Sequence, residues 1–206
     1  NLGDITLTGV DIVAKNKPNA VPGEQKGYIN IATTSGNIVY SNGADTAVHS
    51  YVLKAKAEDG ITVQTGNGSI ISTVNYEAGN SIALTAAKAG TDNSLGSISQ
   101  VGNLQAGLYV VDNEGYAVAD VGAVAINGAQ DVSVQGNLFA AEGINITSSQ
   151  GAVTLQGELK AGTAIDLAAK GNITATGDMY AGNNISVGHN SDTAHAAAVE
   201  ITNSVI

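Results

Sequence analysis

The chain of 206 residues has no cysteine, no arginine and no tryptophan, and only two prolines and one phenylalanine. Without cysteine there is no disulfide framework, no thiol nucleophile and no cysteine-ligated zinc. Without arginine there is no bidentate clamp for a carboxylate or phosphate group. Eight lysines face 18 acidic residues, so the net charge is −10. This balance argues against nucleic-acid binding, because phosphates are neutralised by clustered positive side chains.

Long apolar runs are absent as well. No stretch approaches the roughly 18 apolar residues of a membrane-spanning helix, so we expect no membrane span. Residues 1–4 have neither the basic start nor the apolar segment of a signal peptide. We therefore expect that a leader has been removed or that the chain is part of a longer protein.

What the chain does contain is 43% hydrophobic residues and 26 glycines, with only 4% aromatics. This is enough apolar material for a folded core, which must be built from Val, Ile, Leu and Ala.

The C-terminal part of the sequence is an internal repeat. Copies of one phrase begin at Val132, Val153 and Ile173, which are 21 and 20 residues apart. Within each copy a glycine, an apolar residue, an alanine and a second apolar pair recur at fixed offsets. Less regular copies begin at Ile5, Ile38, Ile70, Ile98 and Val199. Such self-similarity is the sequence signature of a solenoid whose base unit is about 20 residues.

Each unit contains short runs in which apolar and polar residues alternate, which is the period of a half-buried strand. The runs end at Gly, Asn or Asp, which favour turns, and no long helical pattern is present. We predict an all-β, right-handed parallel β-helix (solenoid) of about eight coils with loop or hairpin insertions. Residues 1–206 form a single β-helical segment, with long insertions in 1–131 and more regular coils in 132–206. A β-sandwich is the alternative, and it predicts no stacking register.

The repeat also predicts which side chains stack and where loops leave the scaffold. The expected interior columns are Val132/Val153/Ile173, Leu138/Leu159/Met179 and Ile144/Ile165/Ile185. The expected insertions are residues 10–27, 43–60, 108–123 and 188–198. Loops on a rigid scaffold are where binding sites are usually found.

The phrase Gly-(Asn/Glu/Asp)-(Leu/Met)-x-Ala-(Gly/Ala) stands at 102–107, 136–141, 157–162 and 177–182. It resembles the repeats of filamentous haemagglutinins, which occur in large bacterial exoproteins of two-partner secretion systems and in related autotransporter passengers. The resemblance is good over 98–187 and loose over 1–97. It implies secretion to the bacterial cell surface, a long β-helical rod, and adhesion to host cells or to other bacteria. The absence of cysteine fits export through a narrow pore.

Five tyrosines lie in or beside the predicted insertions: Tyr28, Tyr40, Tyr51, Tyr109 and Tyr116. Tyrosine is a good contact residue for proteins and sugars, so these are our candidate binding residues. The partner we expect is a host or bacterial surface protein or glycan. The alternative role for these rings is to cover the core beneath the loops.

Catalysis is the less favoured interpretation. Asn137, Glu158 and Asp178 occupy equivalent positions, so two carboxylates would lie about 5 Å apart on adjacent coils. A glycosidase or lyase needs such clustered carboxylates, but a solvated outer face explains them equally well, and Lys160 is the only cation nearby. We therefore expect no catalytic residues and no enzyme.

Metal binding has two weak candidates. His189 and His195 share a predicted loop with Asp192, but their spacing matches no zinc motif, so we expect no metal there. Calcium is the one cofactor left open, through the oxygen ligands of Asp92-Asn93 and of residues 112–114 with Asp120. Turn chemistry alone also explains these pairs.

The sequence as a whole predicts a structural or adhesive segment of a secreted or cell-surface bacterial exoprotein. It would present loops to host cells, bacteria or matrix and perform no chemistry. Residues 1–4 and 202–206 do not read as polar caps, so a self-assembling extracellular filament, with subunits stacked end to end, is the alternative. A carbohydrate-active enzyme is the third interpretation.

Overall fold

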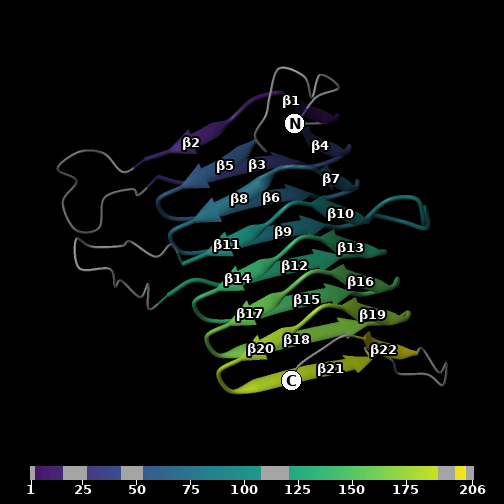
Figure 1. The fold of residues 1–206 in the computed structure, drawn as a ribbon. Helices are drawn as coiled ribbons and strands as arrows, with labels where there is room; N and C mark the ends of the chain where they lie inside the picture. Colours follow the sequence, from purple (N-terminus) through teal and green to yellow (C-terminus); the bar gives the residue numbers. More distant parts are fainter. Residues whose placement is uncertain (1–2, 16–26, 43–52, 108–120, 190–197, 203–206) are drawn as a thin grey trace, which may run out of the picture.

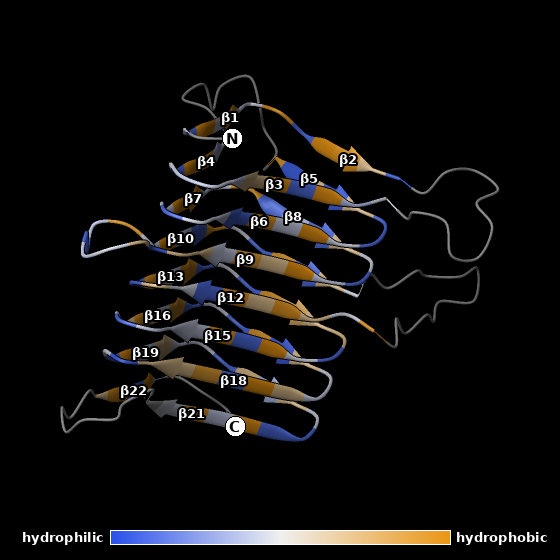
Figure 2. Cartoon of the chain, turned by 180° about the vertical axis from the view of Figure 1, so that it is seen from behind, coloured by the Kyte–Doolittle hydropathy of each residue, from blue (hydrophilic) through white to orange (hydrophobic). Residues whose placement is uncertain are grey.

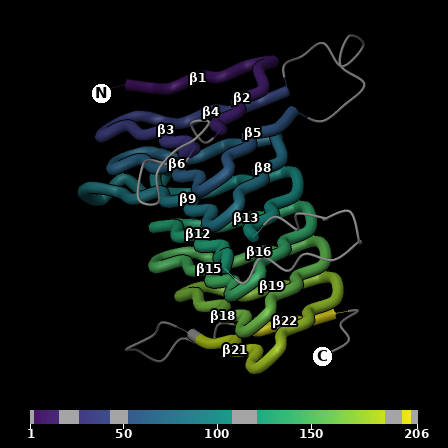
Figure 3. The backbone as a smooth tube through the Cα atoms, turned by 90° about the vertical axis from the view of Figure 1, so that its left-hand side faces the viewer, coloured from purple at the N-terminus to yellow at the C-terminus, as the bar shows by residue number. Residues whose placement is uncertain are grey.

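The computed structural model describes residues 3–15, 27–42, 53–107, 121–189 and 198–202, and within these ranges it contains strands and no helix. The strands form three parallel sheets that wind around one core as a right-handed β-helix (Figure 1). Seven complete coils and the first strand of an eighth are stacked, as the backbone tube in Figure 3 shows. The predicted fold class is confirmed. No helix that could cross a membrane occurs in the described part of the chain.

Each complete coil contributes one strand to each sheet, always in the same order. The first sheet consists of β1 (Ile5–Thr8), β4 (Ile38–Ser41), β7 (Ile70–Ser72), β10 (Ile98–Val101), β13 (Val132–Gln135), β16 (Val153–Gln156), β19 (Ile173–Thr176) and β22 (Val199–Thr202). The second consists of β2 (Ile12–Ala14), β5 (Lys54–Ala57), β8 (Asn75–Ala78), β11 (Leu104–Ala106), β14 (Leu138–Ala140), β17 (Leu159–Ala161) and β20 (Met179–Ala181). The third consists of β3 (Ile29–Thr33), β6 (Ile61–Thr65), β9 (Ile82–Ala86), β12 (Val124–Gly128), β15 (Ile144–Ser148), β18 (Ala164–Ala169) and β21 (Asn184–His189).

The register of the first sheet reproduces the repeat found in the sequence. The opening residues of all eight units are Cα partners in one column: Ile5, Ile38, Ile70, Ile98, Val132, Val153, Ile173 and Val199. The predicted columns in the second and third sheets are also present. One repeat unit is therefore one coil, and the β-sandwich alternative is wrong.

The core follows from the alternation within each strand. In β15, Ile144 and Ile146 point inward and are buried, whereas Asn145 between them is exposed. Figure 2 shows the same apolar segments recurring at the same place in successive strands. Burial of these aliphatic columns supplies the main stabilisation, since each buried side chain contributes about 1.5–3 kcal/mol.

Polar side chains at one corner link each coil to the next. The Oδ1 atom of Asn75 accepts a hydrogen bond from the backbone N–H of Asn103 at 2.7 Å, and Asn103 and Asn137 do the same for the following coils. At another corner Asp4, Asn37, Asp131 and Asn172 accept backbone N–H groups in the same direction. These bonds satisfy amides that the sheets do not pair, so the Asn and Asp positions of the repeat have a structural role.

The glycine of the repeat phrase is required by the turn between the first and second sheets. Gly157 has a φ of +136°, a conformation that residues with a side chain rarely adopt. A Cβ atom at Gly157 would also collide with the carbonyl oxygen of Gly136 on the preceding coil.

Insertions leave the corners without changing the stack. Residues 107–123 join β11 to β12, and only residues 141–143 join β14 to β15 on the next coil. Both connections start and end at paired positions, because Ala106 pairs with Ala140 and Val124 with Ile144. A 17-residue segment and a three-residue turn are therefore interchangeable at this corner.

The predicted insertion limits were wrong in three places. The segments 10–27 and 43–60 contain β2 and β5, which belong to the second sheet. The inward residues of β5 are alanines, those of β2 are Ile12 and Ala14, and both strands lack the glycine of the repeat phrase, so their pattern was weak. The third error is a missed insertion, residues 87–97 between β9 and β10, which projects beside β10 in Figure 1.

We expect Gly157→Ala to lower the free energy of unfolding by about 1–3 kcal/mol, because it adds backbone strain and a steric collision. Gly143→Ala is the matched control. Its new Cβ would lie 3.5 Å from the nearest atom, the carbonyl oxygen of Ala164, and should change stability little. Urea denaturation of both variants measures the difference, and equal losses would contradict the proposed role of Gly157.

Candidate binding surfaces

Tyr40 is not a surface residue, which corrects the prediction that it contacts a partner. Its side chain is fully buried and its ring packs edge-on against Tyr76, with centroids 6.2 Å apart and an interplanar angle of 77°. The Tyr40 hydroxyl donates a hydrogen bond to the carbonyl oxygen of Val10 at 2.8 Å. Burial, together with the charge of Asp11, raises the pKa of Tyr40 to about 12. Tyr40 therefore covers and fills the core, which was the alternative role.

Tyr28 is the candidate that the structure places at the surface. It stands just before β3, is 48% exposed, and its hydroxyl forms a hydrogen bond with the hydroxyl of Thr62 on the next coil. The other three candidates, Tyr51, Tyr109 and Tyr116, lie outside the described residues. Their role as contact residues stays a prediction.

The outer faces of the three sheets differ in chemistry. Outward positions of the first and third sheets carry mainly Thr, Ser, Asn, Gln and Ala, with Glu200 and Asp166 as their only charged residues among the described strands. The second sheet instead presents a column that is charged or aromatic from its second strand to its last, apart from one glutamine: Lys56, Glu77, Gln105, Phe139, Lys160 and Tyr180. Among the outer faces of the described strands, charged and aromatic side chains are therefore concentrated on the second sheet.

A charged cluster occupies the N-terminal half of that column. Glu77 on β8 pairs with two lysines of β5, with its Oε1 atom 2.7 Å from Lys54 Nζ and its Oε2 atom 3.3 Å from Lys56 Nζ. Burial alone would raise the pKa of Glu77, but the hydrogen bonds and charges of the lysines outweigh it and hold the pKa below its ordinary value. The cluster ties the second coil to the third.

The C-terminal half carries the two carboxylates that the enzyme interpretation singled out. Glu158 and Asp178 directly precede paired residues of β17 and β20, so they lie one coil apart, as predicted. The hydroxyl of Tyr180 donates to Asp178 Oδ2 at 3.3 Å, and the charge of Asp178 raises the pKa of Tyr180. Phe139 and Tyr180 were not predicted as contact residues from the sequence. Both stand at the x position of the repeat phrase, and the alternation of inward and outward residues places this position on the outer face.

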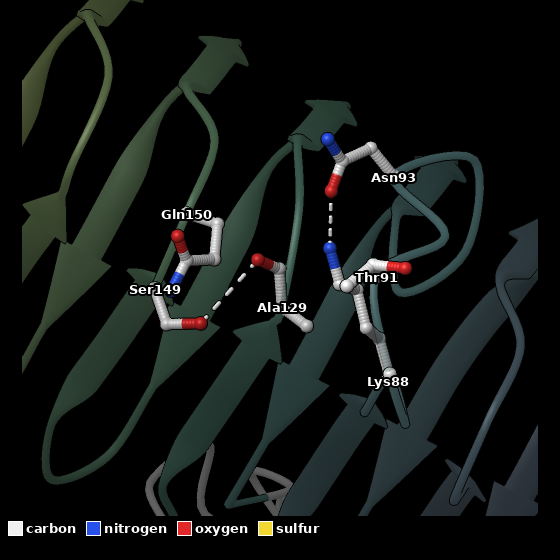
Figure 4. Close-up of a pocket in the computed structure, with 7 residues that line it drawn as sticks. Lys88, Thr91, Asn93, Ala129, Ser149 and Gln150 are labelled. Carbon is white, nitrogen blue, oxygen red and sulfur yellow. Dashed lines mark hydrogen bonds between the residues drawn. The ribbon is translucent and has the colours of Figure 1, made fainter.

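A polar hollow lies beneath the 87–97 insertion, and Figure 4 shows it in close-up. Its volume is about 500 Å³, and it is open to solvent. The lining comes from the insertion and from the corners of the following coils: Lys88, Gly90, Thr91, Asn93, Ala129, Ser149 and Gln150. This hollow was not among the sites predicted from the sequence. The sequence does contain a signal for this insertion. The repeat units that begin at Ile70 and Ile98 are 28 residues apart, which is longer than the base unit of about 20 residues by enough to form a loop.

Metal candidates gain no structural support. In the ranges that the structure describes, no three His, Asp or Glu side chains gather closely enough to hold a metal ion. Asp92 instead accepts hydrogen bonds from the N–H and hydroxyl of Ser94, which lower its pKa. Its neighbour Asn93 accepts a hydrogen bond from Lys88 Nζ. Of His189 only the backbone is described, and the other predicted ligands lie outside the described residues: residues 112–114, Asp120, Asp192 and His195. Calcium binding there stays a prediction.

Comparison of the chain with protein-family models, with curated proteins and with solved structures found no match. The filamentous haemagglutinin resemblance therefore depends on the repeat phrase alone. Function has to be argued from the scaffold and from the surfaces described above.

The Glu77 cluster predicts a pH-dependent contribution to stability. Because the folded-state pKa of Glu77 is below its ordinary value, the stabilisation is present at neutral pH and is lost as pH falls through the folded-state pKa. We expect Glu77→Gln to cost about 1 kcal/mol or less at neutral pH, since both lysines are half exposed to solvent.

Thermal or urea unfolding of Glu77→Gln and the parent chain, measured from pH 7 to pH 3, tests this expectation. The two stabilities should converge at the acidic end. Asp166→Asn, an exposed acid on the third sheet, is the control and should show no comparable convergence. A difference that is constant across the whole pH range would contradict the assignment.

Proposed function

We propose that this chain is a scaffold segment of a secreted or cell-surface bacterial adhesin, and that it presents loops at its corners to a surface protein or glycan. In this proposal the β-helix itself performs no chemistry. The location outside the cell rests on the resemblance of the repeat phrase to filamentous haemagglutinins and on the absence of cysteine.

One observation carries the proposal: successive coils pair in the same register whether a long insertion or a short turn connects their strands. The 107–123 connection and the 141–143 turn leave and re-enter the scaffold at paired positions, so loop sequence and coil geometry are independent. A scaffold of this kind holds variable loops at fixed points on a rigid body, which is the general arrangement of loop-based binding sites.

The chemistry of the outer faces supports the same conclusion. Two of the three sheets present mainly uncharged polar residues and alanine in their described strands, with Ile71 and Val101 as exposed apolar exceptions, so they offer few charged groups for a specific contact. The insertions and the second sheet provide the charged and aromatic groups that hot spots of interfaces are made from.

Replacing the insertions with turns taken from the chain itself tests the proposal. In one variant the turn 141–143 replaces residues 107–123, and in a second the turn 170–172 replaces residues 87–97. We expect both variants to keep the β-sheet circular dichroism of the parent, because the flanking strands are already in register. We expect at least one to lose adhesion of bacterial or epithelial cells to the immobilised chain.

The matched control replaces the turn 141–143 with the equivalent residues 162–164, which alters a corner without removing a long insertion or touching the hollow. This control should adhere like the parent chain. If both insertion variants fold and adhere as well as the parent, the loops are not the binding elements and the proposal is wrong.

A carbohydrate-active enzyme is the second candidate, and the stacking of Glu158 and Asp178 beside Tyr180 is the observation that favours it. If the chain degrades polysaccharide, Glu158→Gln and Asp178→Asn should each reduce turnover by at least about a hundredfold. Reducing-end assays on a panel of polysaccharides measure this, with Asp166→Asn as the control. Absence of turnover in the parent chain on every polysaccharide removes the candidate.

End-to-end assembly stays a prediction. The first and the seventh coils carry half-buried apolar residues that pack against the core, among them Ile5, Leu7, Ile185 and Val187. Such residues suit contact with a further coil, whether of the same chain or of a second copy.

A further inference from the structure

We propose that the hollow beneath the 87–97 insertion is a saccharide-binding site that takes an acidic sugar chain, in particular a uronate oligosaccharide. The inference rests on the proposed adhesive function and names one site and one ligand class for it. Three properties of the hollow support this ligand class: an ordered loop, a surplus of hydrogen-bond donors, and an open shape.

The loop that forms the hollow is held in place by its own hydrogen bonds. The N–H of Ala89 donates to Asn67 Oδ1 at 3.0 Å, and the N–H of Gly96 donates to the carbonyl oxygen of Gly68 at 2.9 Å. Between these anchors, Asp92 accepts the N–H and the hydroxyl of Ser94 at 2.9 and 2.7 Å. A ligand that binds here does not have to order the loop first, so less binding energy is lost to entropy.

Two lysines fix the orientation of the amide side chains around the hollow. Lys88 Nζ donates to Asn93 Oδ1, as the dashed line in Figure 4 shows, and Lys170 Nζ donates to Gln150 Oε1 at 3.2 Å. An ammonium group can only donate, so each amide must turn its oxygen toward the lysine.

The consequence is a surplus of donors. The Nδ2 group of Asn93 and the Nε2 group of Gln150 have no hydrogen-bond partner within the described part of the chain. Each ammonium also retains N–H groups beyond the one it uses. The hydroxyl of Ser149 already donates to the carbonyl oxygen of Ala129 at 3.3 Å, so its remaining capacity is to accept.

No acidic side chain takes up these donors. None of the residues that line the hollow carries a carboxylate, and neither Lys88 nor Lys170 forms an ion pair within the described part of the chain. Asp92 is near enough to Lys88 for the lysine charge to help lower its pKa, but it accepts its hydrogen bonds from Ser94, and Asp131 accepts the N–H of Ala152 at 2.8 Å. A ligand rich in acceptors, with a carboxylate to meet an ammonium, therefore fits this hollow better than a neutral or cationic one.

The shape of the hollow selects a chain over a small molecule. Its volume of about 500 Å³ is within the range of ligand sites, but it is open to solvent and not enclosed. An open polar hollow holds one or two residues of a sugar chain while the rest continues outside. Single contacts of this kind are weak, and adhesion would be strengthened by many copies on one surface.

Titration of the full chain with a short oligogalacturonate, followed by calorimetry, tests the proposal. We expect saturable binding that weakens with added salt, and binding of a neutral galactose oligosaccharide of the same length that is at least about tenfold weaker. Equal affinity for the neutral oligosaccharide, or no binding of the uronate, would overturn the proposal.

Variants locate the site. Lys88→Met and Gln150→Leu should each weaken uronate binding about tenfold, since each removes a donor to a charged ligand. Lys160→Met removes an exposed lysine of β17, away from the hollow, and is the matched control. Circular dichroism confirms that each variant is folded. Loss of binding in Lys160→Met as large as in Lys88→Met would show a general charge effect and overturn the site.

The same variants separate this inference from the adhesive function itself. If the parent chain does not bind the uronate, and Lys88→Met adheres to cells as well as the parent does, the site is overturned and the adhesin proposal stands. Uronate binding that is lost in Lys88→Met, in a chain that adheres to no cells, supports the site and overturns the adhesin proposal.

Discussion

In the described coils, nearly every strand residue lies beside an equivalent residue of a neighbouring coil, because parallel strands of successive coils pair at one fixed register. Side chains therefore form columns, and each column has to be made of residues that tolerate their own kind as neighbours. Aliphatic side chains do so in the interior, because stacked Val, Ile and Leu side chains pack closely and carry no polar atoms that need a partner. The composition of the chain, rich in Val, Ile and Ala and poor in aromatics and charge, follows from this constraint.

The corners obey the same constraint with different chemistry. A residue at a corner meets the backbone of the coil before it, so a side chain there either has to be absent or has to bond to that backbone. Gly157 represents the first solution, because a Cβ atom would collide with the carbonyl group of Gly136. Asn137 represents the second, since its amide oxygen accepts the N–H of Glu158 at 3.0 Å. The repeat phrase contains both kinds of residue in neighbouring positions, as in Gly136 and Asn137.

Charged and aromatic side chains are concentrated at positions that do not have to stack on an equivalent residue of the next coil. Insertions escape this constraint because they leave the stack at a corner and return to the same position, which lets 87–97 reach over the corners of later coils and form a hollow with Ser149 and Gln150. Outward positions of the second sheet escape it because they face solvent, where unlike side chains can be neighbours. There Glu77 forms ion pairs with two lysines, and the hydroxyl of Tyr180 donates to Asp178. The corners and the outer face of the second sheet are therefore the surfaces where we expect partners to bind.

The sequence by itself determined the coil unit, the column of repeat starts from Ile5 to Val199, and the aliphatic core, because a period of about 20 residues and an alternation of two are local properties of a chain. Alternation from Ile38 would also have placed Tyr40 inward, two residues later, had it been applied beyond the regular repeats. Only the tertiary structure decided the limits of β2 and β5, whose patterns are too short to read alone, and the partners of Asn93 and Gln150. Those two residues lie 57 positions apart in the chain, and they border one hollow because two coils and an insertion fold between them.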